Sequence, residues 1–473
     1  MRRLRFENAI WILFGIFTLN FILKFLFIEA PSVGGDEPFS IFYAQTDFQT
    51  LLELSKQENN PPFFTILLKV WTSFFGISPV SVRFLPLIFS SLTASFIFLM
   101  TRELTSTRFG IIGAAIFTFS NYHIQFSHEA RPYALFGLLT IMALYYTYKL
   151  LQTQQRKWLI LTVLVNTLLI YNHFFGFFVL LIQLFMLVLL FRKDNPWKQI
   201  AIAWGITSLF YLPYLPFLLK RFMISSEGGT WLTIPKPEEL YSIFVKFSNV
   251  PVVAAFSLLL LIIGIVINRL VWRDAKFLFL AVSLFVPLLF IFLVSQYIPM
   301  FLDRYLVFLG IVFILALTYF LSKIQIRAAR ISIIVLILLG FVLTIDPTSG
   351  NKAPDKELVE ALIENRKNKA QTLIAPPYYA YNFVYHFEPD WMLKPETCWQ
   401  QMNNENIRSV QNLGQLQELK LENECFLVAK GPEKNAELLK VLKKLDELYL
   451  DKKELFSEEG DVVLYYSGLI DLK

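Results

Sequence analysis

Charged residues are scarce in this sequence. Asp, Glu, Lys and Arg together make up 17% of its 473 residues, whereas 55% are hydrophobic and 48 are phenylalanine. A soluble globular domain has about 25% charged residues, so this composition excludes an ordinary soluble protein. It indicates a membrane protein instead.

Several binding motifs are also missing. The sequence has no GxGxxG or Walker-type segment, which excludes the common phosphate-binding loops for nucleotides. Its two cysteines, Cys398 and Cys425, have no CxxC spacing, and they form either one disulfide or two separate thiols. The lack of an N-x-S/T sequon disfavours a glycosylated eukaryotic surface protein.

Long apolar runs fill the chain up to residue 346. A run of about 20 apolar residues is long enough to cross the hydrocarbon core of a bilayer. We expect about eleven transmembrane helices, at residues 9–28, 80–100, 109–125, 133–150, 158–172, 174–191, 199–219, 251–271, 277–297, 305–322 and 330–346.

The positions of lysine and arginine predict the orientation of these helices. Cytoplasmic loops are the ones enriched in Lys and Arg, so we expect a cytoplasmic N-terminus. The inner loops then hold Arg2, Arg3, Arg5, Arg102, Arg108, Lys149, Arg156, Lys157, Arg192, Lys193, Lys198, Arg269, Arg273, Lys276, Lys323, Arg327 and Arg330. The net charge of +6 therefore reflects topology and not a nucleic-acid partner. An odd number of spans places the tail outside.

The tail differs in composition from the rest of the chain. After the linker-like DPTSGNKAPDK, the segments KELVEALIENRK and EKNAELLKVLKKLDEL have helical periodicity, and TLIA, CFLVA and VVLYY are typical of short buried strands. The sequence therefore predicts a transmembrane domain at 1–346 and a small extracytoplasmic α/β domain at 347–473.

An acidic pair, Asp36 and Glu37, stands at the start of the first outer loop, in the segment VGGDEPFS. The two glycines permit a sharp turn, and Pro38 suits the first turn of a helix. The apolar residues that follow fit one helical face, which predicts an amphipathic helix on the membrane surface: Phe39, Phe42, Phe48, Leu51 and Leu52. Its positive N-terminal end would keep the acidic pair ionised and able to accept a proton. The alternative is a capped, solvated loop.

Further polar residues fall on the same outer side. His128, Glu129, Arg131 and Tyr133 cluster in QFSHEARPYAL, where one span ends and the next begins. An arginine at this depth faces the protein interior, an anion or the headgroups, because facing lipid costs on the order of 1–3 kcal/mol. Pairing of Arg131 with Glu129, or snorkelling to phospholipid, is the simpler interpretation.

Three shorter motifs complete this outer set. NNPPFF, which includes Asn59 and Asn60, opens an apolar stretch shorter than a span and is either a surface helix or a packing feature. YNHFFG places His173 at a span end, where a histidine is usually structural. DRYL places Arg304 beside Asp303, and the two charges form either a simple ion pair or part of a site.

These motifs, in this order, resemble those of the GT-C superfamily of polytopic glycosyltransferases. The similarity is to the branch that includes protein O-mannosyltransferases and bacterial lipid-A aminoarabinose transferases, and it spans most of residues 1–320. The resemblance implies transfer of a hexose or pentose from a polyprenyl-phosphate carrier to an extracytoplasmic acceptor hydroxyl, with inversion. It also implies a multi-pass protein of a prokaryotic plasma membrane.

The resemblance assigns roles to residues of this sequence. Asp36 would be the general base and Glu37 its helper, while Arg131 and Arg304 would stabilise the phosphate leaving group. The remaining substrate-binding positions are His128, Glu129, Tyr133, His173, Asn60 and Tyr305. Related enzymes often carry His or Lys before the two prolines, where this chain has Asn59 and Asn60. Some members use a divalent metal ion near the first-loop acid, and the sequence leaves its presence here open.

A transporter or lipid flippase is the alternative function. Eleven spans with charged residues near the outer face are compatible with a pathway. The spans hold few ionisable residues at mid-depth, however, and no half-chain repeat is visible. These features favour the enzyme.

Overall fold

The computed structural model describes residues 6–55, 60–191, 196–227, 232–266, 274–348, 350, 353–432, 435–458 and 460–470. It divides into two compact units. The first comprises residues 1–30, 52–67 and 83–350, and the second comprises residues 31–51, 68–82 and 351–473. The second unit therefore contains two segments of the predicted first outer loop as well as the tail. The predicted boundary at 346/347 stays a prediction.

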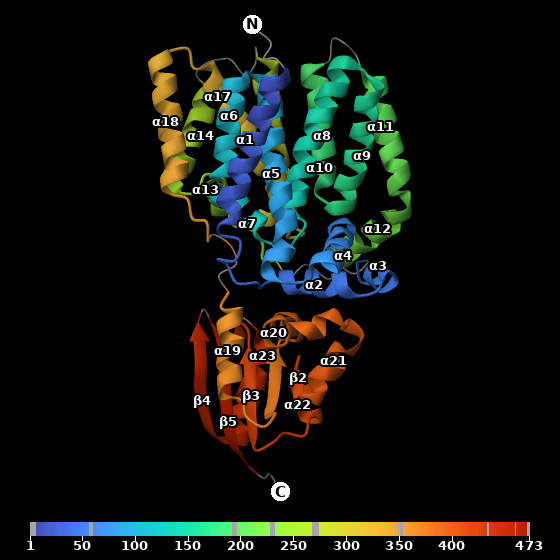
Figure 1. Ribbon diagram of the computed structural model, residues 1–473, viewed down its shortest axis with the longest axis vertical. Helices are drawn as coiled ribbons and strands as arrows, with labels where there is room; N and C mark the ends of the chain where they lie inside the picture. Colours follow the sequence, from blue (N-terminus) through green and yellow to red (C-terminus); the bar gives the residue numbers. More distant parts are fainter. Residues whose placement is uncertain are drawn as a thin grey trace. The chain divides into compact units, whose positions relative to one another are not determined.

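The first unit is a bundle of helices (Figure 1). Its helices are α1 (Phe6–Phe25), α6 (Thr107–Thr118), α7 (Asn121–Ser127), α8 (Tyr133–Thr153), α9 (Arg156–Asn172), α10 (Gly176–Leu190), α11 (Trp197–Tyr211), α12 (Leu215–Glu227), α13 (Glu238–Phe247), α14 (Pro251–Val266), α16 (Ala275–Val294), α17 (Val307–Lys323) and α18 (Arg327–Leu343), with the 3-10 turns η1 (Leu212–Tyr214) and η2 (Asp303–Tyr305). Three further helices, α3 (Phe48–Ser55), α4 (Phe63–Phe75) and α5 (Pro79–Leu104), cross the boundary between the units.

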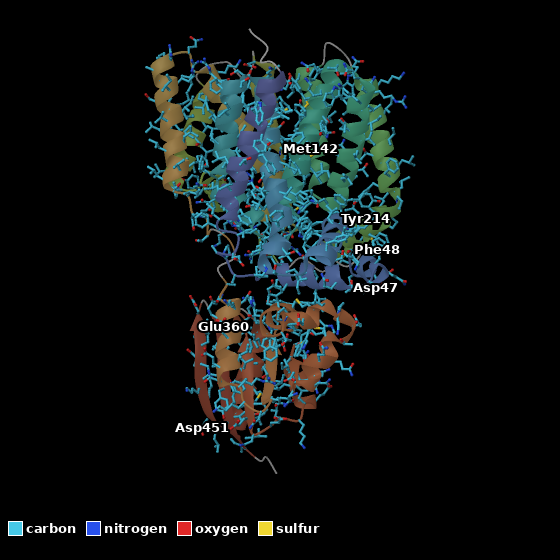
Figure 2. All side chains as sticks on the ribbon, viewed as in Figure 1. Asp47, Phe48, Met142, Tyr214, Glu360 and Asp451 are labelled. Atoms are coloured by element: carbon cyan, nitrogen blue, oxygen red, sulfur yellow. The ribbon has the colours of Figure 1, made fainter. Side chains whose placement is uncertain are left out.

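Helix α17 forms the centre of the bundle. Every residue from Val307 to Leu321 is buried, and the helix contacts α6, α8, α14 and α16. A helix that is apolar on all sides belongs inside a protein or a membrane. Figure 2 shows the side chains of this unit and labels Met142, a partly buried residue of α8. The polar motifs found in the sequence lie at the N-terminal ends of α8 and α17 and at the C-terminal end of α9.

The helices confirm a membrane protein but not the number of spans. Each of the eleven predicted runs overlaps a helix. Among the described residues, four helices are long and apolar enough to cross a bilayer, namely Pro79–Leu104, Tyr133–Thr153, Trp197–Ile224 and Ala275–Val294. A fifth span arises if α13 and α14, bent by 100° at their junction, count as one. Of the basic residues used for topology, Arg2, Arg3, Arg5, Arg192, Lys193, Arg269 and Arg273 lie outside the described residues.

The predicted surface helix of the first loop is wrong in two respects. The chain forms two helices here, α2 (Glu37–Gln45) and α3, because Thr46 is extended and Asp47 starts a new helix by accepting hydrogen bonds from Gln49 N and Thr50 N at 2.9 and 3.0 Å. The apolar face of α2 also packs on protein. Phe42 is 5% exposed, and the centroid of its ring lies 5.1 Å from that of Tyr381 and 5.3 Å from that of Trp399.

The tail folds around a mixed sheet, as expected. The strands are β1 (Gln371–Ala375), β2 (Ile407–Ser409), β3 (Glu424–Ala429), β4 (Tyr449–Glu458) and β5 (Asp461–Leu469), and the sheet order is β2-β1-β3-β5-β4. The helices are α19 (Asp355–Asn365), α20 (Ala380–Phe387), α21 (Pro395–Asn404), α22 (Leu413–Glu418) and α23 (Ala436–Leu448), with the turns η3 (Pro377–Tyr379) and η4 (Pro389–Leu393). The strands β1, β2 and β3 are parallel, and β3, β5 and β4 are antiparallel.

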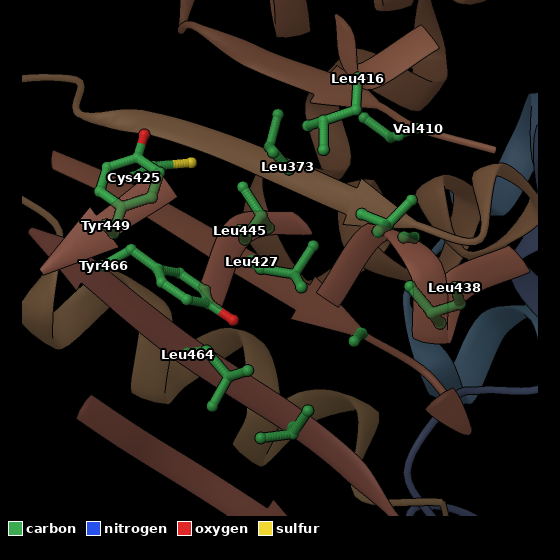
Figure 3. Packing of buried hydrophobic residues seen from close by; sticks show 14 residues of the cluster. Leu373, Val410, Leu416, Cys425, Leu427, Leu438, Leu445, Tyr449, Leu464 and Tyr466 are labelled. Carbon is green, nitrogen blue, oxygen red and sulfur yellow. The ribbon is translucent and has the colours of Figure 1, made fainter. Parts of the chain in front are cut away.

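A compact apolar core supports one face of this sheet (Figure 3). Leu373, Leu427 and Leu445, from β1, β3 and α23, are fully buried in it. Cys425 lies in the same cluster, and Cys398 is buried in α21. Both cysteines are free thiols, which answers the question that the sequence left open.

Candidate functional site

The turn between α7 and α8 places Arg131 inside the first unit. His128 closes α7 through a backbone hydrogen bond to Gln125, and Arg131 N donates to the carbonyl of Glu129 at 2.7 Å. The next residue, Pro132, stands before α8 because its fixed φ suits a helix start. The turn leaves Arg131 only 8% exposed.

A side-chain hydrogen bond joins this turn to the end of α9. Asn172 Nδ2 donates to the carbonyl of Pro132 at 3.1 Å, and the next residue is His173. His173 is 2% exposed, and its ring stacks on Phe136 with the centroids 4.6 Å apart. The α8 and α9 motifs, 40 residues apart in sequence, therefore meet at one place.

The hydrogen bonds of His173 define its tautomer. Its Nδ1 accepts a hydrogen bond from Phe175 N at 3.1 Å, so Nε2 carries the ring hydrogen. Nε2 has no hydrogen-bond partner among the described residues. Burial, together with the charges of Arg131 and Arg304, lowers the pKa of His173 to about 3. The ring is therefore neutral at pH 7 and presents one N–H.

Arg304 and Tyr305 reach the same place from η2, before α17. The guanidinium carbon of Arg304 lies 5.9 Å from the centre of the Tyr133 ring, and the Tyr305 ring lies 5.3 Å from that of His173. The five residues Arg131, Tyr133, His173, Arg304 and Tyr305 form what we call the cationic cluster. Asp303 forms an ion pair with Lys246 of α13.

The other predicted residues of the first unit have different surroundings. His128 Nε2 contacts the backbone oxygen of Lys24 at 2.8 Å, and burial lowers the pKa of His128 to about 4. Glu129 is half-buried in the turn itself. Asn60 precedes α4, and its buried Oδ1 has no hydrogen-bond partner among the described residues, whereas Asn59 lies outside them.

Sequence reasoning missed two buried cations, Lys24 and Arg83. Lys24 Nζ donates to Ser90 Oγ at 2.7 Å and to the carbonyl of His123 at 3.3 Å, and Arg83 Nη1 donates to the carbonyl of Ile28 at 3.0 Å. Both are fully buried. Each is a lone basic residue inside an apolar run, and that is the signal that could have revealed them.

A small cavity adjoins the cationic cluster at Tyr133. Its lining comes from α5, α6, α7, α8 and α17, namely Ser90, Thr93, Phe117, His123, Phe126, Tyr133, Ala134, Gly137 and Val307. Lys24 lies next to this lining through Ser90 and His123. Lys24 therefore lies near one part of the cavity lining, and the cationic cluster adjoins another part at Tyr133.

The acidic pair belongs to the second unit. Asp36 precedes α2 as its N-cap residue, and Glu37, 1% exposed, accepts a hydrogen bond from Gly34 N at 3.4 Å through Oε2. Partial desolvation raises the pKa of Tyr378, and the charges of Asp461 and Asp36 act in the same direction, against the opposing charge of Lys430. The Asp36 carboxylate therefore lies near enough to Tyr378 for its charge to act on that ring.

The described residues contain no group of three or more His, Cys, Asp or Glu side chains that could hold a metal ion. Zinc and calcium sites built from protein ligands alone need such a group. No chemical step proposed below involves a metal.

Comparison with known proteins gives the fold a family context. Residues 59–220 match the family described as dolichyl-phosphate-mannose-protein mannosyltransferase. ArnT from Cupriavidus metallidurans in the apo state has 12% sequence identity and a TM-score of 0.62, over 97% of this chain and 98% of that chain. The chain has a GT-C glycosyltransferase fold. No curated protein is similar enough in sequence to match it.

Two further structures share this GT-C fold. ArnT from Cupriavidus metallidurans bound to undecaprenyl phosphate has 13% identity and a TM-score of 0.57, over 96% of this chain and 98% of that chain. The Archaeoglobus fulgidus oligosaccharyltransferase in the apo form has 12% identity and a TM-score of 0.54, over 79% of this chain and 64% of that chain. The resemblance to the GT-C superfamily is therefore confirmed. The family match includes Asn60, Arg131 and His173, but neither Asp36 nor Arg304.

Proposed function

We propose that this chain is an integral membrane glycosyltransferase that moves a sugar from a polyprenyl-phosphate donor to an acceptor hydroxyl outside the membrane. The observation that carries the proposal is the cationic cluster, in which two arginines flank a buried neutral His173. An arginine fork binds phosphate oxygens in two places and stays charged. The GT-C fold, and the structural similarity to ArnT bound to undecaprenyl phosphate, support a lipid-linked donor.

The proposed reaction is an inverting displacement. The carboxylate of Asp36 takes the proton of the acceptor hydroxyl, and the acceptor oxygen forms a bond to the anomeric carbon of the sugar. The bond from that carbon to the phosphate oxygen breaks at the same time, and polyprenyl phosphate leaves with an additional negative charge. Glu37 helps to orient the substrate.

The cationic cluster would stabilise the charge that develops on the leaving phosphate. Arg131 and Arg304 supply positive charge from a site that is largely closed to water, where such charges act strongly. His173 supplies the N–H of its Nε2, which has no partner among the described residues. Tyr133 and Tyr305 hold the two flanking groups in place through their rings.

The remaining assignments are proposals of the same kind. His128 holds the Arg131 turn against α1, and Glu129 and Asn60 complete the substrate-binding set. We place the N-terminus in the cytoplasm and the tail outside a prokaryotic plasma membrane, following the distribution of Lys and Arg. The donor sugar is a hexose or pentose, and the acceptor is a lipid, glycan or protein hydroxyl.

Reconstitution with defined donors tests this function. The purified protein in lipid nanodiscs is given polyprenyl-phosphate sugars with an acceptor mixture, and the release of polyprenyl phosphate is measured. We expect turnover by the wild type and a loss of about 100-fold or more in Asp36→Asn, since this change removes the base. Equal turnover by both proteins contradicts the role of Asp36. If no donor is consumed but labelled lipid crosses the bilayer of proteoliposomes, the chain is a flippase.

A further inference from the structure

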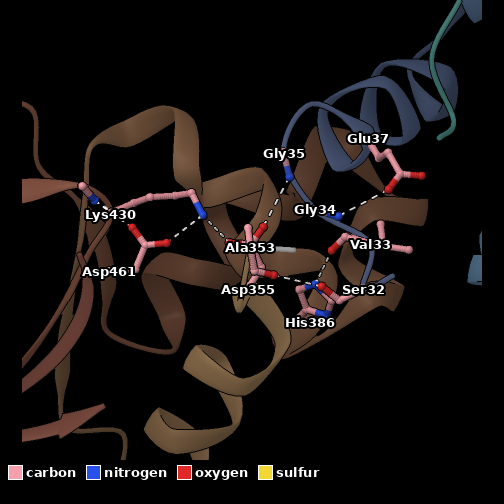
Figure 4. Close-up of polar contacts among 11 residues, drawn as sticks. Ser32, Val33, Gly34, Gly35, Glu37, Ala353, Asp355, His386, Lys430 and Asp461 are labelled. Carbon is pink, nitrogen blue, oxygen red and sulfur yellow. Dashed lines mark hydrogen bonds and ion pairs between the residues drawn. The ribbon is translucent and has the colours of Figure 1, made fainter. Parts of the chain in front are cut away.

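The turn that carries the acidic pair is anchored by polar contacts within the second unit (Figure 4). Ser32 Oγ donates to the carbonyl of Ala353 at 3.0 Å, and His386 Nε2 lies 2.6 Å from the carbonyl of Val33. A carbonyl can only accept, so this nitrogen of His386 carries the hydrogen. The third contact joins Gly35 N to Asp355 Oδ2 at 3.3 Å.

Asp355 is a buried carboxylate whose two oxygens have different partners. Its side chain is fully buried at the start of α19. Oδ1 accepts a hydrogen bond from Lys430 Nζ at 2.6 Å, and Oδ2 accepts from Gly35 N. A buried charge is stable only when it is paired and hydrogen-bonded, so these two contacts fix the orientation of the carboxylate.

A second carboxylate completes the anchor. Lys430 Nζ also lies 3.0 Å from Asp461 Oδ2, and Asp461 Oδ1 accepts from Gly431 N at 2.8 Å. Burial acts to lower the pKa of Lys430, but the charges of Asp355 and Asp461 outweigh it and raise the pKa above its ordinary value. Lys430 therefore stays charged and holds Asp355 in place. This anchor connects β3 and β5 to Gly35 (Figure 4).

The anchor ends at the residue before Asp36. Gly35 is exposed and has a φ of +59°, a conformation that a turn needs and glycine adopts without strain. Such a turn has other conformations of similar energy, and the direction of the next side chain depends on which one it adopts. The hydrogen bond to Asp355 selects one of them. A hydrogen bond from Gly34 N to the side chain of Glu37 joins the residues on the two sides of the Gly35–Asp36 segment.

We propose that Asp355 is a positioning residue for sugar transfer, because it holds the peptide of Gly35 and so sets the direction of the Asp36 carboxylate. This inference rests on the proposed function, in which Asp36 is the base. A buried ion pair in an α/β unit needs no bond to a loop in order to stabilise the sheet. The second oxygen of Asp355 faces Gly35 and not a cation, and this contact distinguishes a positioning role from stabilisation of the sheet alone.

Two double variants isolate the hydrogen bond to Gly35. Lys430→Met with Asp355→Asn keeps an acceptor for Gly35 N, whereas Lys430→Met with Asp355→Leu removes it. Both lack the same charges, so general effects of losing the ion pair cancel in the comparison. Glu437→Gln, which breaks an exposed ion pair of the same unit, is the control for surface changes.

The measurements are kcat and KM for the donor, together with hydrogen exchange of the peptide covering residues 32–37. We expect the Leu variant to have a kcat about 10- to 100-fold below that of the Asn variant, since small misplacements of a catalytic group cost this much. KM for the donor should differ by less than about twofold, and exchange should be faster only in the Leu variant. Glu437→Gln should match the wild type.

The outcomes separate this inference from the proposed function. Equal kcat in the two double variants overturns the positioning role, provided that Asp36→Asn is inactive. If hydrogen exchange of residues 32–37 is equally fast in the two double variants, the hydrogen bond to Gly35 does not hold this turn, whatever the activity. A wild type that consumes no donor, or an Asp36→Asn variant that is fully active, overturns the proposed function and with it the role of Asp355.

Discussion

The chemistry that we propose for the first unit depends on a few residues with unusual surroundings. Arg131 is buried, and both its charge and that of Arg304 act on the buried ring of His173. Buried cations of this kind mark functional positions in membrane proteins. The arrangement is complementary to a doubly charged phosphate, and two predictions follow at this scale.

Replacing either arginine by lysine tests whether the fork of the guanidinium matters. We expect Arg131→Lys or Arg304→Lys to lower kcat/KM for the donor by about 10- to 100-fold, because lysine keeps the charge but loses two-point binding. Steady-state kinetics with a purified donor would measure this loss. Arg102→Lys, at the far end of α5 over the Phe98 ring, is the matched control and should have no effect. Unchanged kinetics in both cluster variants would contradict phosphate binding by the arginines.

The lowered pKa of His173 predicts a dependence of stability on pH. Its pKa is about 3 in the folded protein against 6.5 for an ordinary histidine, so the unfolded chain binds the proton more strongly. The stabilisation is complete above about pH 6.5 and is lost progressively as the pH falls towards 3. His128, with a pKa of about 4, contributes in the same direction.

Thermal unfolding of the wild type and His173→Gln in detergent would measure this effect. The difference between their unfolding midpoints should be constant above pH 7 and should shift against the wild type between pH 6.5 and 5. A difference that is the same at every pH in this range would show that His173 does not titrate as the structure indicates. His128→Gln gives an independent comparison.

At the residue scale, the sequence indicates which residue types belong to the candidate site more readily than it indicates their burial and partners. Arg131 is indicated by the cost of a charge at a span end, and His173 and Arg304 by their predicted position on the same face. Lys24 and Arg83 were missed because nothing in the sequence tells which face of a helix a lone cation occupies. The partner of Asp303 was also out of reach, since Lys246 is 57 residues away.

At the scale of elements, the first loop shows how a repeated apolar pattern misleads. Phe39, Phe42, Phe48 and Leu51 fit one helical face, and the break at Thr46 does not disturb that spacing. Asp47 indicates the start of a second helix, because an aspartate before an apolar run is a typical N-cap. The contact of α2 with Tyr381 and Trp399 depends on the tertiary fold, so the sequence alone could not distinguish it from contact with lipid.

The elements of the tail predict the reactivity of the cysteines. Cys398 in α21 and Cys425 in β3 are fully buried, and burial raises their thiol pKa values to about 11 and about 12. We expect neither to react with a disulfide reagent such as DTNB in the native protein at pH 8, and both to react after denaturation. Thiol counting with and without denaturant would check this result.

A native protein in which one or two thiols react within minutes would contradict the burial of that helix or strand. Cys398→Ser and Cys425→Ser then identify which thiol is accessible. Neither variant removes a disulfide, because both thiols are free.

At the scale of the whole molecule, binding of the lipid carrier should stabilise the fold. A ligand at 100 times its dissociation constant adds about 2.7 kcal/mol to the free energy of unfolding. We expect polyprenyl phosphate to raise the unfolding midpoint in nanodiscs, whereas the matching polyprenol, which lacks the phosphate, should not. The double variant Arg131→Gln and Arg304→Gln should lose the response. An equal shift with polyprenol would mean that the isoprenoid chain alone is recognised.

The sequence predicted the architecture at this scale only in outline. Apolar runs identified a helical membrane protein and a separate α/β tail, because composition reports burial over long stretches. The number of spans was less accessible, since several helices are short and α13 and α14 form a bent pair. The membership of residues 31–51 and 68–82 in the unit of the tail has no signature in the sequence, because it depends on contacts between distant segments.

The edges of the five-stranded sheet have a consequence for how copies of this protein meet. One edge strand, β2, has three residues, and the other, β4, exposes Asp451, Lys452, Lys453 and Glu454 in succession (Figure 2 labels Asp451). An open strand edge is a template for another chain, and short length and charged side chains both oppose such pairing. Both edges of this sheet therefore disfavour its extension from one copy of the protein into the next.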